Sequence, residues 1–188
     1  DEVITGFGRT GKSFGAESFN VTPDIMTIAK GMTSGMIPMG GVLVKQEIYD
    51  TFMTGPEDSI EFFHGYTYSG HPLAAAAGVA ALEVYEEEGL FQRASELAPI
   101  LEAELQTIKG SQYVIDIRNF GMLGAVELEP IEGKPTARAL SVFRECYSRG
   151  VLVRTTGDTV ALCPPLIASE EQVKTMVQTV KESIAAID

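Results

Sequence analysis

Residues 24–31 read DIMTIAKG, and this stretch decides the fold class. A short apolar segment that follows Pro23 and ends in a charge before glycine predicts a short strand. A glycine-rich loop is expected over residues 31–41, and GGVLVKQ at 40–46 predicts the next strand. Ligands of α/β proteins gather at the carboxyl ends of strands, so Lys30 is a candidate functional residue. Position alone would leave it an ordinary lysine whose amine reaches solvent.

The rest of the first half predicts an α/β arrangement. Residues 1–5 (DEVIT) predict the end of a strand, and the glycines of GFGRTG at 6–11 predict a loop. Pro72 suits the first turn of a helix that runs through alanines and closes at Gly89. Strands that alternate with helices favour a mostly parallel sheet with helical cover.

The pattern changes at Leu90, where we place a domain boundary between residues 1–89 and 90–188. A strand pair is expected around Gly121, and a hairpin is expected to turn at Gly157-Asp158. Three helices complete this compact α/β unit. Their inward positions are expected to be Ala94, Leu97, Leu101, Leu105 and Ile108 in the first, Ala139, Val142, Phe143 and Cys146 in the second, and Val173, Met176, Val177, Val180 and Ile184 in the third, which opens with a Ser169/Gln172 capping box.

Composition excludes several function classes. The chain of 188 residues carries 26 acidic and 14 basic side chains, a net charge of −12, which disfavours a nucleic-acid partner. Its longest apolar run, residues 73–82, is far shorter than the roughly 20 residues that cross a bilayer. Cys146 and Cys163 follow apolar patterns without ligand spacing, so we expect reduced core residues. The sequence shows no signal peptide, which favours a cytoplasmic location.

One motif suggests a different function. Gly6, Gly11, Lys12 and Ser13 match the phosphate-loop pattern G-x-x-x-x-G-K-[ST]. Such a loop binds phosphate because a long helix begins at its Lys-Ser. The residues that follow, 14–25, contain glycine, asparagine and proline within about three helical turns, so no long helix is expected. A nucleotide-binding protein is therefore an alternative with weak support.

A set of short motifs, in order and spacing, resembles the class III, or omega, aminotransferases. The resemblance covers essentially the whole chain, and the combination is far more specific than any single piece. The motifs are Asp1-Glu2-Val3, GFGRTG at 6–11, Phe14-Gly15, Pro23-Asp24, Ala29-Lys30-Gly31, HGYTYSGHP at 64–72, Gly121, Gly124, Glu127, Val153-Arg154, Gly157-Asp158 and Pro164-Pro165.

The resemblance implies the aspartate-aminotransferase-like fold of enzymes that use pyridoxal 5'-phosphate (PLP). Residues 1–89 would be the C-terminal part of the large PLP-binding domain, and 90–188 the small C-terminal domain. Lys30 would be the Schiff-base lysine and the catalytic residue. Asp1 would pair with the pyridine nitrogen and Val3 would pack against the ring.

The resemblance also implies a homodimer with shared sites. Thr67 would bind the phosphate of the cofactor in the partner subunit, with the backbone of Tyr66 alongside, and its hydroxyl could also cap the following helix. Arg154 would bind the substrate carboxylate, because guanidinium offers two parallel donors. Arg9 is the rival for this role, although its loop is mainly structural in the family. We expect no metal site, since two histidines, His64 and His71, find no fitting third ligand.

The predicted function is transfer of an amino group from an amine or omega-amino acid to a keto acid, with pyruvate the expected acceptor. Family relatives that racemise or shift amino groups share most of these motifs, so the exact reaction stays open. A non-catalytic protein with this scaffold is a further alternative. The 188 residues do not include the upstream phosphate loop or the aromatic residue that stacks on the ring in the family, so we expect no useful activity from them alone.

Overall fold

The computed structural model describes residues 1–58 and 64–187. These residues divide into two compact units. Of the described residues, unit 1 contains 1–7, 12–58 and 64–89, and unit 2 contains 8–11 and 90–187. Within the described ranges, every helix is too short or too polar to cross a membrane.

Unit 1 contains a two-stranded antiparallel sheet. Strand β1 (Ile25–Ala29) pairs with β2 (Gly40–Val44), with Met26 opposite Leu43. The mostly parallel arrangement expected from the sequence is not seen in this pair. Only residues 30–39 join the two strands, which is too short for the crossover that parallel strands need. The expected loop over 31–41 was also wrong in part, because the 3-10 helix η1 (Lys30–Thr33) opens it and β2 begins within it.

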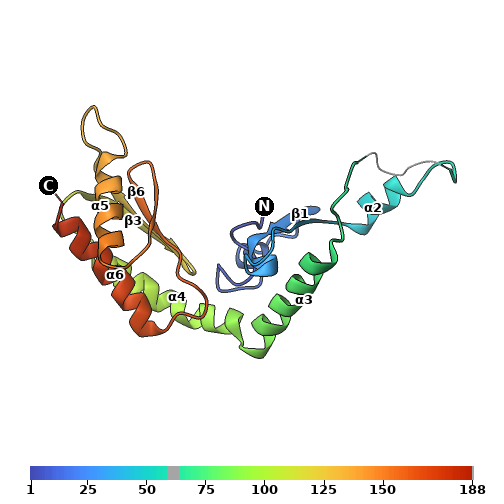
Figure 1. Ribbon diagram of the computed structural model, residues 1–188, viewed down its shortest axis with the longest axis horizontal. Coiled ribbons are helices and arrows are strands. Elements are labelled where there is room, and N and C mark those ends of the chain that lie inside the picture. Colours follow the sequence, from blue (N-terminus) through green and yellow to red (C-terminus); the bar gives the residue numbers. More distant parts are fainter. Residues whose placement is uncertain (59–63, 188) are drawn as a thin grey trace. The chain divides into compact units, whose positions relative to one another are not determined.

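Two further helices belong to unit 1. Helix α3 (Pro72–Glu87; Figure 1) begins at Pro72 as predicted. It packs on η1 through small residues such as Gly78. Helix α2 (Gln46–Phe52) was not predicted. It buries none of its residues, so the sequence carries no apolar periodicity that would have indicated it.

The amino-terminal residues form turns rather than the strand end expected for 1–5. The chain reverses at once, because the amide of Gly6 donates to the carbonyl of Glu2 at 3.0 Å. The helix after the phosphate-loop match is α1 (Gly15–Ser18), which has only four residues. The predicted absence of a long helix after Lys12-Ser13 is thus confirmed.

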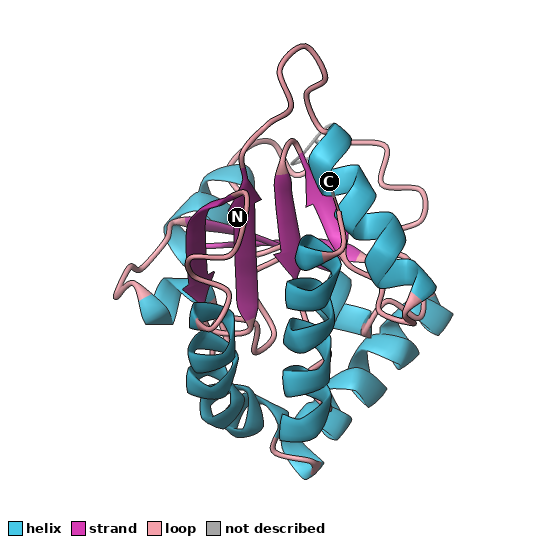
Figure 2. Cartoon of the chain, turned by 90° about the vertical axis from the view of Figure 1, so that its left-hand side faces the viewer, coloured by secondary structure: helices cyan, strands magenta, loops and turns pink. Residues whose placement is uncertain are grey.

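Unit 2 is a two-layer α/β unit. Its four-stranded sheet is antiparallel throughout, in the order β3-β4-β6-β5 (Figures 1 and 2). Its strands are β3 (Val114–Phe120), β4 (Leu123–Leu128), β5 (Arg154–Thr156) and β6 (Thr159–Leu162). Its helices are α4 (Leu90–Gln106), α5 (Ala137–Ser148) and α6 (Glu170–Ala185). Two helices, α4 and α5, pack against the sheet, and a third, α6, packs against those two helices. The predicted strand pair, hairpin and helices are confirmed.

The capping box of α6 is present in both directions: the Gln172 amide donates to the Ser169 hydroxyl oxygen at 3.1 Å, and the Ser169 amide donates to the Gln172 side chain at 2.8 Å. The largest fully buried side chains among the described residues all lie in unit 2. They are Leu101, Leu105, Ile108, Met122, Val126, Leu128, Val142, Val160, Val173, Val177, Val180 and Ile184.

Three expected core positions differ. Phe143 and Met176 are only half-buried. Cys146 is buried as expected, but Cys163 is exposed. Side chains alternate along β6, and because Val160 and Leu162 face the core, the next position, Cys163, faces outward.

The segment Gly8–Gly11 groups with unit 2 although its neighbours in the chain belong to unit 1. The Arg9 carbonyl accepts a hydrogen bond from the amide of Met122 at 2.9 Å. A Cβ on Gly121 would lie 2.6 Å from the Thr10 backbone, so only glycine permits this approach. Residues 8–11 of the GFGRTG loop therefore pack in the unit that contains the β3–β4 turn, whereas Gly6 and Phe7 belong to unit 1.

Candidate active site

The backbone brings residues 1–3 beside the strand that leads to Lys30. The amide of Glu2 donates to the carbonyl of Thr27 in β1 at 2.8 Å. Lys30 follows Thr27 by three residues, which is roughly 10 Å along an extended strand. Asp1, Val3 and Lys30 therefore lie in one region of unit 1.

Asp1 is held by a local turn. Its Oδ1 accepts a hydrogen bond from the Val3 amide at 2.8 Å, a pattern by which aspartate fixes its own backbone two residues on. The Asp1 side chain is exposed and Val3 is half-buried. This turn fixes where the Asp1 carboxylate lies relative to the start of unit 1.

Glu2 is a buried carboxylate that the sequence did not point to. Only 5% of it is exposed, and its oxygens accept hydrogen bonds from the amides of Gly15 at 2.9 Å and Ala16 at 2.6 Å, and from the Thr5 hydroxyl. Burial by itself raises the pKa of Glu2, but the bonds from Thr5, Ala16 and Gly15 outweigh it and hold the pKa below its ordinary value of 4.5. Glu2 ties the start of the chain to α1.

Lys30 adopts an uncommon backbone conformation. It is exposed, it opens η1, and its φ of 49° lies in the left-handed region. Left-handed conformations cost non-glycine residues roughly 1–2 kcal/mol and cluster at functional sites. Ser34 and Tyr66 also have a left-handed φ, of 51° and 49°.

Tyr66 and Thr67 lie in an exposed turn ahead of α3. The Ser69 amide donates to the Tyr66 carbonyl at 3.0 Å, and the His64 and Tyr66 rings meet edge to face at 4.4 Å. The cap of α3 is His71, without a side-chain hydrogen bond to the helix. The capping role considered for Thr67 is therefore wrong, because a tight turn separates its hydroxyl from the helix start.

Arg154 is the first residue of β5 in unit 2, and it is exposed. The hairpin that carries it turns at Gly157-Asp158, and the Asp158 Oδ2 accepts a hydrogen bond from the amide of Thr136 at 3.0 Å. Arg9 donates from Nη1 to the carbonyl of Pro164, which supports the structural role implied for it.

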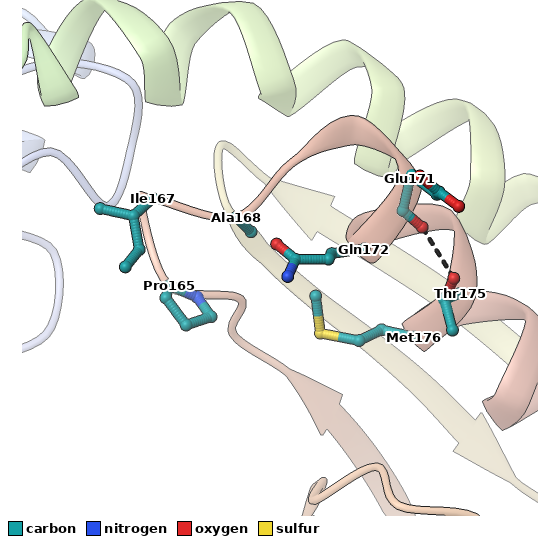
Figure 3. A pocket seen from close by; sticks show the side chains of 7 residues that line it. All are labelled: Pro165, Ile167, Ala168, Glu171, Gln172, Thr175 and Met176. Carbon is teal, nitrogen blue, oxygen red and sulfur yellow. Dashed lines mark hydrogen bonds between the residues drawn. The ribbon is translucent and has the colours of Figure 1, made fainter.

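A pocket of about 560 Å³ lies elsewhere in unit 2, at the start of α6 (Figure 3). Figure 3 also shows the hydrogen bond from the Thr175 hydroxyl to the Glu171 carbonyl, 2.8 Å long. None of the predicted site residues lines this pocket. Its lining residues are Pro165, Ile167, Ala168, Glu171, Gln172, Thr175 and Met176.

Comparison with known proteins agrees with the resemblance. The family described as aminotransferase class-III matches residues 1–184. An omega-aminotransferase of Caulobacter vibrioides is 48% identical over all of this chain and 43% of its own length. A beta-alanine–pyruvate aminotransferase of Pseudomonas aeruginosa is 46% identical over all of this chain and 42% of its own length.

Solved structures agree as well. An aminotransferase of Bacillus anthracis superposes with a TM-score of 0.90 at 36% identity, over 100% of this chain and 44% of that one. A transaminase from the marine bacterium Virgibacillus gives 0.87 at 40% identity, over 98% of this chain and 44% of that one. The chain thus spans less than half the length of these relatives. These matches confirm the predicted fold class: the chain belongs to the class III aminotransferase family.

Proposed function

We propose that the full-length protein is a PLP-dependent transaminase that moves an amino group from an amine or omega-amino acid to a keto acid, with pyruvate the preferred acceptor. The observation that carries the proposal is the hydrogen bond from the Glu2 amide to the Thr27 carbonyl. It holds the start of the chain beside β1, the strand that leads directly into Lys30 with its left-handed backbone. The 46% identity to a beta-alanine–pyruvate aminotransferase supports pyruvate.

The residues present fit PLP. The cofactor has an aldehyde, which condenses with a primary amine, and a pyridine ring that withdraws electrons when its nitrogen is protonated. Lys30 supplies an exposed primary amine, and Asp1 supplies an exposed carboxylate in the same region. Val3, whose amide donates to the Asp1 carboxylate, supplies an aliphatic side chain in the same segment. This donor set is the one that the cofactor needs.

Lys30 has two proposed roles. Its Nζ would hold the cofactor by a covalent bond to the aldehyde carbon. When free, the same amine would act as general base toward the proton on the substrate carbon that bears the nitrogen, and as general acid when it returns that proton. Asp1 would favour the protonated pyridine nitrogen, because a nearby carboxylate stabilises the positive charge.

The remaining proposed roles concern binding. The Thr67 hydroxyl and the Tyr66 backbone bind the phosphate of the partner subunit's cofactor, which makes the protein a homodimer. Arg154 binds the carboxylate of the substrate. Unit 1 corresponds to the C-terminal part of the large PLP-binding domain, and unit 2 to the small C-terminal domain.

A transamination assay on the full-length protein tests the proposal. Beta-alanine and pyruvate are supplied with PLP, and alanine is measured. We expect turnover from the wild type and a loss of at least a thousandfold in Lys30→Ala, because the general base and the covalent attachment are both lost. Lys12→Ala is the matched control, since Lys12 is also an exposed lysine of unit 1 and should leave turnover unchanged.

The same variants separate the two alternatives. A nucleotide-binding protein would gain thermal stability from ATP, and Lys12→Ala would abolish that gain. A non-catalytic scaffold would show neither turnover nor stabilisation by ATP. Either result would overturn the transaminase proposal.

A further inference from the structure

The strained backbone of Lys30 is held by neighbouring residues. Its carbonyl accepts a hydrogen bond from the amide of Gly35 at 3.1 Å, which closes the turn after η1. The hydrogen bonds of a 3-10 helix have poorer geometry than those of an α-helix, and a left-handed lysine adds strain. The next residue, Gly31, contacts both α3 and the amino-terminal loop. These contacts restrain the backbone of Lys30.

Tyr85 reaches Gly31 from α3. Its hydroxyl donates to the Gly31 carbonyl at 2.7 Å, across a sequence separation of 54 residues. The same carbonyl accepts from the Ser34 amide at 3.0 Å, so both of its lone pairs are engaged. Gly78, on the same helix, lies where an added Cβ would be 3.5 Å from the Met32 carbonyl, so α3 packs directly against η1.

Phe7 closes the other side of Gly31. A Cβ on Gly31 would lie 2.6 Å from the Cβ of Phe7, so the two residues are in close contact and only glycine fits. The Phe7 ring is buried, stacks on the Tyr85 ring at 6.1 Å, and meets the Phe14 ring edge to face at 5.5 Å. Phe7 and Tyr85 therefore contact each other and hold Gly31 between them. We call this pair the Gly31 clamp.

We propose that Tyr85 is a positioning residue for Lys30: through the Gly31 clamp it keeps the lysine backbone left-handed and so restricts where Nζ can lie. The inference rests on the proposed function of Lys30. The bond between Nζ and the cofactor aldehyde carbon forms with loss of water, and it forms more readily when the amine is already restricted. The same restriction favours proton transfer by the released amine.

The test is Tyr85→Phe in the full-length protein, which removes one hydroxyl and keeps the ring stacked on Phe7. Loss of one neutral hydrogen bond corresponds to about a three- to tenfold effect. We expect kcat to fall by that factor while KM for beta-alanine and pyruvate stays unchanged. Apparent affinity for PLP, measured by fluorescence titration of the apoprotein, should weaken by a similar factor. Tyr147→Phe, at an exposed tyrosine of unit 2, is the control and should change neither quantity.

The Lys30→Ala variant shows whether Tyr85 acts through Lys30 or supports PLP binding independently of that lysine. Without Nζ there is no covalent attachment, so adding Tyr85→Phe should leave the weaker PLP affinity of Lys30→Ala unchanged. The inference would be overturned if Tyr85→Phe weakened PLP affinity equally in both backgrounds, or if Tyr85→Phe matched the wild type in kcat and PLP affinity. The proposed function would stand in either case. If the wild type itself bound no PLP, the proposed function would fail instead.

Discussion

At the scale of single residues, the buried carboxylate of Glu2 predicts a pH dependence. Its pKa is lowered in the folded protein, so its contribution to stability is complete above its ordinary value of 4.5 and is lost as the pH falls through the lowered pKa. We expect Glu2→Gln to lower the free energy of unfolding at pH 7 by about 1.5–3 kcal/mol, the range for hydrogen bonds to charged groups.

Denaturant unfolding of both full-length proteins at pH 7 and at pH 3.5 measures this effect. The difference between Glu2→Gln and the wild type should shrink at the lower pH. Glu17→Gln on α1 is the control, because Glu17 is exposed, and it should change stability by less than about 0.5 kcal/mol. A constant difference at both pH values would contradict the role assigned to the Glu2 charge.

The two cysteines predict different thiol reactivity. Burial raises the pKa of the Cys146 thiol, so little thiolate forms at neutral pH, whereas Cys163 is exposed. We expect Cys163 to react with an aromatic disulfide reagent at least tenfold faster than Cys146 in the folded protein. Peptide mass spectrometry at timed intervals identifies the modified residue. Modification of Cys146 faster than that of Cys163 would contradict the burial of Cys146 in α5.

At the scale of elements, the turn between β3 and β4 predicts a specific steric defect. Gly121 has a φ of 57°, and a Cβ there would lie 2.6 Å from the Thr10 backbone. Gly157, in the turn between β5 and β6, has a φ of 59° but open space around it. Alanine at either position would have to adopt a left-handed backbone conformation, which lowers stability by roughly 1–2 kcal/mol.

Gly121→Ala should therefore lower the stability of the protein by about 1–3 kcal/mol more than Gly157→Ala does. The extra loss is expected because the backbone at Thr10 must also move to make room for the added methyl group. Thermal unfolding of the two full-length variants measures the difference. Equal losses of stability would mean that the segment Gly8–Gly11 does not pack on Gly121 as described.

The elements that the sequence predicted are those with local signals. The β3–β4 pair turns at a glycine, α3 begins at a proline, and α6 carries both partners of its capping box. Helix α2 was not predicted because none of its residues is buried. The helix η1 was not predicted because the glycine-rich sequence after Lys30 is typical of a loop. The direction in which β1 and β2 pair depends on the length of the segment between them. Because the loop expected over residues 31–41 was wrong in part, the antiparallel pairing was not predicted.

The same reasoning applies to the candidate site. Lys30, Asp1 and Arg154 could be proposed from motifs, because the family carries these residue types in this order. Glu2 and Tyr85 could not, since each acts on residues far along the chain: Glu2 on Gly15, thirteen residues away, and Tyr85 on Gly31, 54 residues away. No periodicity or local motif encodes such contacts.

At the scale of the whole molecule, the two units differ in how well they bury apolar side chains. The largest fully buried residues all belong to unit 2, whereas most exposed large apolar side chains of the described residues belong to unit 1. An isolated two-stranded sheet is marginally stable in water, and unit 1 has only β1 and β2 in its described part. Unit 1 therefore depends on further contacts for its stability.

We expect residues 1–188, expressed alone, to show no transamination above background under conditions in which the full-length protein turns over. Limited proteolysis of this 188-residue chain should cleave within unit 1 before unit 2, because unit 2 has the denser core. Turnover by the 188-residue chain would show that the exposed apolar surface of unit 1 needs no further partner.

The most direct test of the central claim is borohydride trapping. The full-length protein is incubated with PLP, reduced with borohydride, digested and analysed by peptide mass spectrometry. Reduction converts a covalent link between PLP and a lysine into a stable phosphopyridoxyl adduct. We predict that this adduct lies on Lys30. Folded, PLP-treated protein that carries no adduct, or carries it only on another lysine, would contradict the assignment of Lys30 as the cofactor-binding residue.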